Sequence, residues 1–112
     1  MFTKLKIWKE SMILVEEVYR QTGLFPGSEV YGLTSQLRRS AVSIPSNIAE
    51  GKGRKTDNEF KQFLYIARGS LFELRTQLEI ARRLGYLEGD TRELKKRIQI
   101  NESMLNSLIT KL

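Results

Sequence analysis

Apolar residues recur along most of this chain at intervals of three and four positions, which is the period of an amphipathic α-helix. The pattern predicts helices at residues 3–21, 29–50, 57–84 and 91–111. The expected connections are short, so consecutive helices should be antiparallel neighbours. The sequence therefore predicts an all-α fold, an antiparallel up-down-up-down four-helix bundle that forms a single domain over residues 1–112.

The first predicted helix is apolar over an unusually wide arc. A heptad-like seam is formed by Leu5, Trp8, Met12, Val15 and Tyr19. A second stripe beside it is formed by Ile7, Leu14 and Val18. One partner helix needs only one such stripe. Either the wide face contacts two helices of the same bundle, or part of it packs against another subunit.

Capping and turn residues mark the expected helix ends. Ser28 is the expected N-cap of the second helix, and Thr56 opens a capping box with Glu59 at the start of the third. Asp90 repeats the cap pattern before the fourth helix. Gly51 and Gly85 are expected to end the second and third helices.

Three residues depart from a plain amphipathic pattern. Pro45 should bend the second helix near Ala41 and free one carbonyl group. Gly69 costs about 1 kcal/mol relative to alanine inside a helix, which predicts the close approach of another backbone there. Asn101 occupies a core position, where it could fix the register or oligomeric state, or pair with a neighbouring helix.

Two motifs give the sequence a family resemblance. The runs SIPSNIAEG and ARGSLFEL occur in this order within the second and third predicted helices. From about Trp8 to Leu87, the chain resembles a four-helix bundle family first noted in intervening sequences of 23S ribosomal RNA genes. It is also similar to the accessory variability determinant of diversity-generating retroelements. The resemblance implies a homo-pentameric ring with a proposed role in nucleic-acid binding, and no settled enzymatic activity.

The composition removes several kinds of active site. The chain has no cysteine and no histidine, so thiolate chemistry, serine–histidine pairs and histidine-based metal sites are all excluded. We therefore expect a non-enzymatic protein that uses neither a metal nor another cofactor. The N-terminal segment has no signal-peptide pattern, and no apolar run reaches the roughly 18 residues that a membrane span requires. These features predict a soluble cytoplasmic protein with no membrane partner.

Charge favours a polyanionic partner. The chain carries 19 Lys and Arg residues against 13 Asp and Glu residues, a formal net charge of +6. The sharpest pattern is a ridge on the third predicted helix, where Lys61, Arg68, Arg75 and Arg82 recur every seven residues. Tyr65 and Phe72 fall between them. Guanidinium groups bind phosphates and aromatic rings stack on unpaired bases, so this ridge is a candidate site for single-stranded nucleic acid.

The ridge also has a purely structural interpretation. Arginines beside a core can pair with carboxylates, and Tyr65 and Phe72 could be buried against a neighbouring subunit. A second candidate basic group consists of Arg38, Arg39, Lys52, Arg54 and Lys55. A third consists of Arg92, Lys95, Lys96 and Arg97. Each group on its own could equally be a solvated surface.

A polar layer is expected where the second and third helices meet. In this layer polar side chains would satisfy one another and the carbonyl freed by Pro45. Its predicted members are Asn47, Glu50, Arg68, Ser70 and Glu73.

The functional hypothesis from the sequence is an oligomeric bundle that binds RNA or DNA through basic ridges, mainly by phosphate contacts. The alternative is a protein–protein scaffold or accessory subunit without direct nucleic-acid binding. Its partner could be a reverse transcriptase or a ribosome-related factor.

Overall fold

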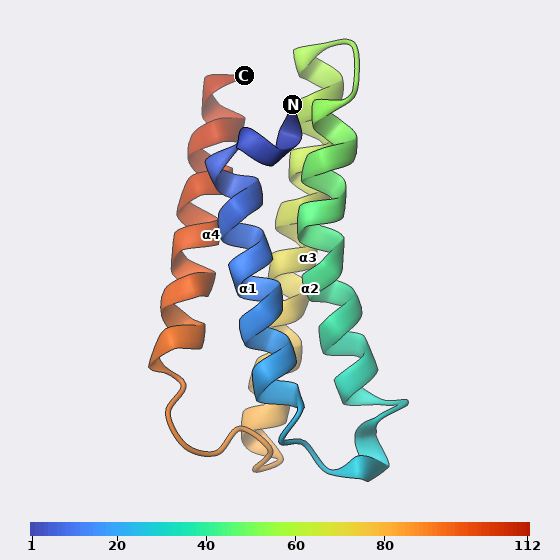
Figure 1. The fold of residues 1–112 in the computed structure, drawn as a ribbon, viewed down its shortest axis with the longest axis vertical. Helices are drawn as coiled ribbons and strands as arrows, with labels where there is room; N and C mark the ends of the chain where they lie inside the picture. The colour runs from blue at the N-terminus through green and yellow to red at the C-terminus, as the bar shows by residue number, and fades with distance from the viewer.

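The computed structural model describes residues 1–112 and contains four long helices (Figure 1). They are α1 (Lys6–Thr22), α2 (Leu33–Lys52), α3 (Asp57–Arg83) and α4 (Arg92–Lys111). Short 3₁₀ turns occupy Phe2–Lys4 and Gly27–Glu29. The helices alternate in direction, so both chain termini and the α2–α3 turn lie at one end of the bundle (Figure 1). The predicted all-α four-helix bundle is confirmed. None of the helices combines the length and apolarity needed to cross a bilayer.

The core is built from one face of each helix, and on α1 the fully buried face is the second stripe, with Leu5, Trp8 and Val15 of the heptad-like seam partly buried against the core. Ile7, Leu14 and Val18 are buried, whereas Met12 and Tyr19 remain 36% and 44% exposed. The buried stripe also includes Ser11, whose hydroxyl donates to the Trp8 carbonyl at 2.7 Å. A satisfied serine can occupy the core, although it interrupts the apolar pattern that the sequence displays. Part of the wide apolar face of α1 is therefore left without a partner in the bundle.

The residues predicted to mark the start and the end of α3 do so in the structure. The Thr56 hydroxyl accepts the Glu59 N–H at 3.1 Å, and α3 begins at Asp57 as expected. Gly85 follows the end of α3 with φ of +80°, a conformation that favours glycine. The Tyr86 N–H donates to the Ala81 carbonyl at 2.9 Å, which closes the helix end as in a Schellman motif.

The predicted start of α2 at residue 29 is wrong. Ser28 lies in a 3₁₀ turn, and α2 begins only at Leu33. The capping oxygen comes instead from Glu29, whose carboxylate accepts the Leu33 N–H at 3.1 Å. The same carboxylate accepts the Tyr86 hydroxyl at 2.9 Å, so it also ties the α1–α2 loop to the α3–α4 loop. The start of α2 therefore coincides with a cap from Glu29, and Tyr86 holds the same carboxylate in place.

The fourth helix starts one residue later than predicted. It begins at Arg92, and its N-cap is Thr91 rather than Asp90. The Asp90 carboxylate still serves this end, because it accepts the Arg92 N–H at 3.0 Å.

The glycine that allows close helix packing is Gly51, not Gly69. Gly69 is exposed, and a Cβ atom added there would meet nothing within 4 Å, so the predicted close approach is wrong within the bundle. A Cβ at Gly51 would lie 2.6 Å from Phe63 Cβ and 3.3 Å from the Phe60 carbonyl oxygen. Gly51 also lies inside α2, which ends at Lys52. The glycine therefore permits the contact with α3 instead of ending the helix.

Asn101 lies in the core, as predicted, and is fully buried. Its amide nitrogen donates to the Arg97 carbonyl at 2.8 Å and to the Glu10 carbonyl of α1 at 3.3 Å. Its amide oxygen is the one buried side-chain polar atom without a hydrogen-bond partner. Asn101 thus links α4 to α1 within one bundle.

Candidate nucleic-acid interface

The arginines of the predicted ridge lie on the side of α3 that faces α4. The Arg75 guanidinium pairs with the Glu102 carboxylate of α4 at 2.5 Å. Arg68 donates to the Asn106 side-chain oxygen of α4 at 3.1 Å. Of the four cations of the ridge, only Lys61 has neither an ion pair nor a side-chain hydrogen bond to an acceptor within the chain. Arg68, Arg75 and Arg82 are therefore engaged by acceptors within the chain, as the structural interpretation of the ridge expects.

Tyr65 and Phe72 are exposed in the single bundle, and their rings are covered in part by arginines. The Arg68 guanidinium carbon lies 4.9 Å from the Tyr65 ring centroid, and that of Arg75 lies 6.0 Å from the Phe72 centroid. These cation–π contacts hold each guanidinium beside an aromatic face. The alternation that is visible in the sequence thus corresponds to two separate pairs, Arg68 with Tyr65 and Arg75 with Phe72.

Glu79 neutralises part of the positive charge at the C-terminal end of the ridge, near the end of α3. Its carboxylate accepts hydrogen bonds from Arg82 at 2.8 and 2.7 Å and from Arg83 at 2.9 Å. These donated hydrogen bonds lower the pKa of Glu79 to about 2, and the same pairing raises the pKa of Arg82. Glu79 therefore stays ionised at neutral pH, and two arginines share one carboxylate.

The lysines near the α2–α3 turn have no such partners. Lys52, Lys55 and Lys61 take part in no ion pair. Arg54 pairs with Glu50 at 3.3 Å, but both side chains are about half exposed, so this contact constrains the guanidinium little.

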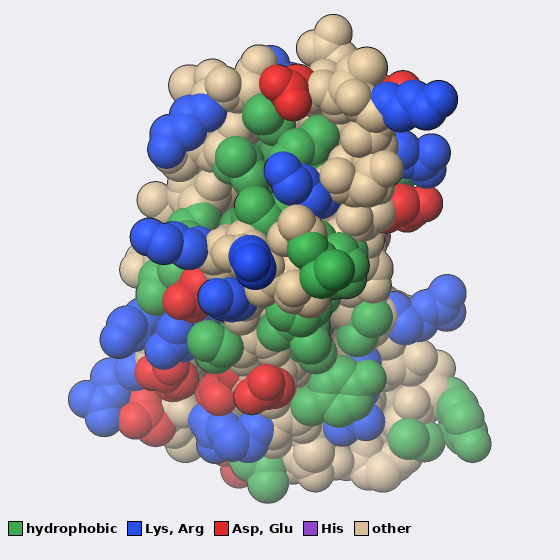
Figure 2. All heavy atoms as spheres, turned by 45° about the horizontal axis from the view of Figure 1, so that its top comes forward, with side chains coloured by type: hydrophobic (Ala, Val, Ile, Leu, Met, Phe, Trp, Pro, Cys, Tyr) green, Lys and Arg blue, Asp and Glu red, His purple; other side chains and the backbone are tan.

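The bundle topology brings further lysines to the same end of the molecule. They lie in the N-terminal turn, the start of α1 and the end of α4: Lys4, Lys6, Lys9 and Lys111. None of them forms an ion pair. We call Lys4, Lys6, Lys9, Lys52, Lys55, Lys61 and Lys111 the terminal lysine cluster. Figure 2, with this end turned forward, shows Lys and Arg side chains around it.

Sequence reasoning missed the four lysines near the chain termini because it grouped charges by their helix. An antiparallel four-helix bundle places the starts of α1 and α3 beside the ends of α2 and α4. The predicted antiparallel topology is therefore sufficient to place these lysines at the same end of the bundle as the α2–α3 turn.

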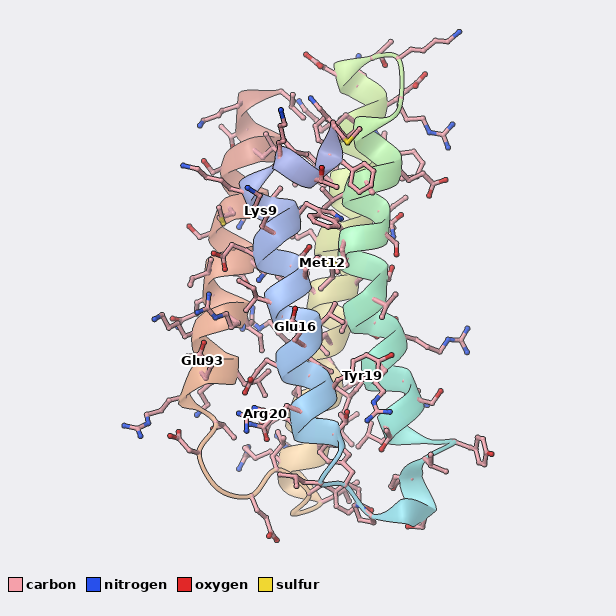
Figure 3. The ribbon with its side chains drawn as sticks, viewed as in Figure 1. Lys9, Met12, Glu16, Tyr19, Arg20 and Glu93 are labelled. Carbon is pink, nitrogen blue, oxygen red and sulfur yellow. The ribbon has the colours of Figure 1, made fainter.

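Arg38 and Arg39 lie toward the opposite end of α2 and are remote from the terminal lysine cluster (Figure 1). Arg38 donates to the Thr22 hydroxyl at 2.9 Å, and its guanidinium carbon lies 4.4 Å from the Tyr19 ring centroid. Figure 3 shows Tyr19 reaching from α1 toward α2 at this level. Arg39 is exposed and has no ion pair. The second predicted group is thus divided between two ends of the bundle.

The third predicted basic group is half neutralised. Arg92 pairs with Asp90 at 2.8 Å, and Arg97 pairs with Glu10 and Glu93 at 2.9 and 2.7 Å. Lys95 and Lys96, which are exposed, form no ion pair.

The polar layer between α2 and α3 exists, with a corrected membership. The Ser43 and Ser70 hydroxyls lie 2.9 Å apart, and the Asn47 amide donates to the Ser43 carbonyl at 2.8 Å. One turn further along, the Ser40 hydroxyl contacts Glu73 at 2.6 Å and Gln77 at 2.9 Å. Three predicted members, Asn47, Ser70 and Glu73, therefore belong to the layer.

Glu50 and Arg68 lie outside the polar layer, which corrects the prediction. Glu50 is exposed and pairs with Arg54 on its own helix. Arg68 projects from the side of α3 that faces α4, where Asn106 accepts its hydrogen bond. Helical spacing explains this, because residue 68 is two positions from Ser70 and hence on a different face.

Comparison with known proteins agrees with this architecture. Residues 3–107 match the family described as 23S rRNA-intervening sequence protein. A crystal structure of a protein with unknown function from the S23 ribosomal protein family of Bacteroides thetaiotaomicron is similar, with a TM-score of 0.69 and 24% identity. The similarity covers 94% of this chain and 95% of that chain, and at this identity it shows a shared fold. A search of curated proteins finds no match. Because the family match spans nearly the whole sequence, the chain belongs to the 23S rRNA-intervening sequence protein family.

Proposed function

We propose that this protein is a non-enzymatic, self-associating bundle that binds RNA or DNA through the terminal lysine cluster. The observation that carries the proposal is the concentration of lysines without ion pairs at one end of the molecule. Lysine ammonium groups that are free of carboxylates release counterions when they contact phosphates. Such contacts give affinity with little base readout. The family's connection with ribosomal RNA genes supports the same class of partner.

The terminal lysine cluster is a better candidate than the arginine ridge of α3. A phosphate that approaches Arg75 or Arg82 must compete with Glu102 or Glu79, which already accept hydrogen bonds from these guanidiniums. It would also be repelled by those carboxylates. Lys52, Lys55 and Lys61 form no ion pair, so a phosphate that approaches their ammonium groups displaces no carboxylate.

We expect the salt dependence of binding to locate the interface. The protein should bind a fluorescein-labelled single-stranded RNA of about 20 nucleotides more tightly as salt is lowered. Replacing Lys52, Lys55 and Lys61 by glutamine should reduce the slope of log K against log salt by about 2, since each contact to a single strand contributes about 0.7. Fluorescence anisotropy at several salt concentrations measures the slope.

The matched control removes three charges from the α3 side. A variant with Arg75, Arg82 and Arg83 replaced by glutamine has the same net charge as the lysine variant, and its slope should stay close to that of the wild type. Equal losses in the two variants would mean that only the total charge matters. Absence of wild-type binding at about 50 mM salt would remove the nucleic-acid proposal itself.

Self-association is supported by exposed apolar residues on the side of the bundle formed by α1 and α2. Met12 and Tyr19 of α1 lie on this side of the bundle, as Figure 3 shows, and Val42 of α2 is also exposed. Tyr31, in the loop before α2, is 96% exposed. Exposed apolar residues that adjoin one another on a surface are typical of protein–protein interfaces.

The oligomer has a direct test. Light scattering should give a mass that is a multiple of the 13.0 kDa chain, about fivefold if the pentamer implied by family resemblance applies. Met12→Glu together with Val42→Glu should shift the mass toward that of one chain, because it places charge in an apolar contact. Ser107→Glu, on an exposed position of α4, should leave the mass unchanged. A wild-type monomer would contradict the proposal.

A protein partner is the second candidate function, and it is favoured by an open groove between α3 and α4 that is lined by apolar and basic residues. That surface is separate from the terminal lysine cluster and from the α1–α2 side.

A further inference from the structure

An open groove of about 1170 Å³ separates α3 from α4. These two helices contact each other less than any other neighbouring pair in the bundle, and the polar side-chain contacts that cross the seam are those of Arg75 with Glu102 and of Arg68 with Asn106. The groove is slightly larger than the roughly 300–1,000 Å³ of typical small-molecule pockets, and it is open to solvent. An open groove between two long helices can accommodate a polypeptide segment.

The groove has an apolar floor. Leu78 and Leu94 line its base and are buried, while Leu87 and Ile98 are half-buried. Phe72 projects at its edge and is 44% exposed. A chain of apolar groups that spans several turns of two helices matches the anchor positions of an amphipathic helix, which recur at intervals of three and four residues.

Cations dominate the rim of the groove. Arg75, Arg82, Arg83 and Lys95 line it, against only two carboxylates, Glu79 and Glu102. Arg82 and Arg83 share Glu79, and Lys95 has no ion pair. The rim therefore retains positive charge after all internal pairs are counted.

We propose that this groove binds an amphipathic helix of a partner protein, with its apolar side on Leu87, Ile98 and Phe72 and acidic residues beside Arg83 and Lys95. A helix satisfies its own backbone hydrogen bonds, whereas an extended peptide would find no free backbone groups on α3 or α4. The charge of the rim selects acidic flanks.

Nucleic acid is the less suitable occupant of this groove. Its sugars and bases would lie against an apolar floor that offers them no hydrogen bonds, whereas the apolar side of a helix needs none. This inference does not depend on the proposed nucleic-acid binding, which concerns the other end of the bundle.

The test uses the full-length chain and a fluorescein-labelled helical peptide of about 18 residues. The peptide has leucines at positions spaced by three and four and glutamates at most other positions, and a second peptide carries lysines in place of the glutamates. Anisotropy should show that the acidic peptide binds at least about tenfold more tightly than the basic one. Phe72→Ala and Arg83→Glu, both at exposed positions, should each weaken its binding by about tenfold.

Two control variants sit elsewhere on the same fold. Ile66→Ala, on a different side of α3, and Arg39→Glu, on α2, should leave peptide affinity within about twofold of wild type. An equal loss with Arg39→Glu would overturn the inference by showing unspecific charge attraction. So would a peptide that keeps its affinity in Phe72→Ala, or displacement of the peptide by the labelled RNA. A fall in oligomer mass with Phe72→Ala would show that a second copy of this chain occupies the groove. That result would also reject the inference.

Discussion

Replacing Gly51 by alanine is expected to destabilise the protein by about 1–3 kcal/mol, although alanine is the better helix former. The new methyl carbon would lie 2.6 Å from Phe63 Cβ and 3.0 Å from Phe60 Cδ1. Phe63 Cβ is fixed to the α3 backbone, so relief requires the end of α2 to move away from α3. Urea denaturation at a fixed protein concentration measures the loss as a lower midpoint with an unchanged slope.

Gly69→Ala is the matched control, because it makes the same chemical change in open space. No atom lies within 4 Å of a Cβ at Gly69, and the residue is inside α3. Alanine should therefore stabilise the helix by about 0.5–1 kcal/mol. A gain at position 51, or equal losses at both positions, would contradict the assignment of the close contact. A loss confined to position 69 would show that another subunit covers Gly69.

Asn101→Asp is expected to cost about 3–5 kcal/mol at neutral pH, the largest effect of any single change considered. The substitution replaces the donating amide nitrogen with an oxygen that faces the Arg97 and Glu10 carbonyls, now 2.8 and 3.3 Å away. An ionised carboxylate in this fully buried position would have no donor. The variant should unfold at a much lower urea concentration than the wild type.

The cost of Asn101→Asp should depend on pH in a defined direction. Burial raises the pKa of the introduced carboxyl above its unfolded value, so the folded variant holds its proton to higher pH. Its stability relative to wild type should be best below about pH 4 and should fall as the pH rises through the folded pKa. Asn101→Leu, which removes the unpaired oxygen at similar volume, should stay within about 1.5 kcal/mol of wild type at every pH. A pH-independent Asn101→Asp penalty would show that the carboxyl is hydrated.

Helical periodicity was sufficient to predict the number, order and direction of the helices. The third helix was predicted to within one residue at each end, because Thr56 and Gly85 act through local backbone contacts. The start of α2 was missed because the Leu33 N–H is accepted by the Glu29 carboxylate, four residues earlier, and not by the side chain of an N-cap residue. Tyr86, which is distant in the sequence, donates to the same carboxylate, and a local pattern does not reveal that second contact.

The candidate site was less accessible to prediction for a similar reason. The heptad repeat of cations on α3 was correctly placed beside the core. Whether these cations are free to bind a ligand depends on the side chains of α4 that face them. Glu102 and Asn106 occupy that facing surface and engage Arg75 and Arg68. A charge pattern on one helix therefore indicates where cations lie, whereas their availability to a ligand is set by the opposing helix.

The placement of both chain ends beside the α2–α3 turn has a practical consequence for handling the protein. A purification tag at either terminus would lie close to the terminal lysine cluster. An acidic or polyhistidine tag would change the local charge and therefore the measured salt dependence of binding. A circular permutant that joins the present termini and opens the chain between Gly23 and Gly27, at the far end, would carry its tag away from these lysines.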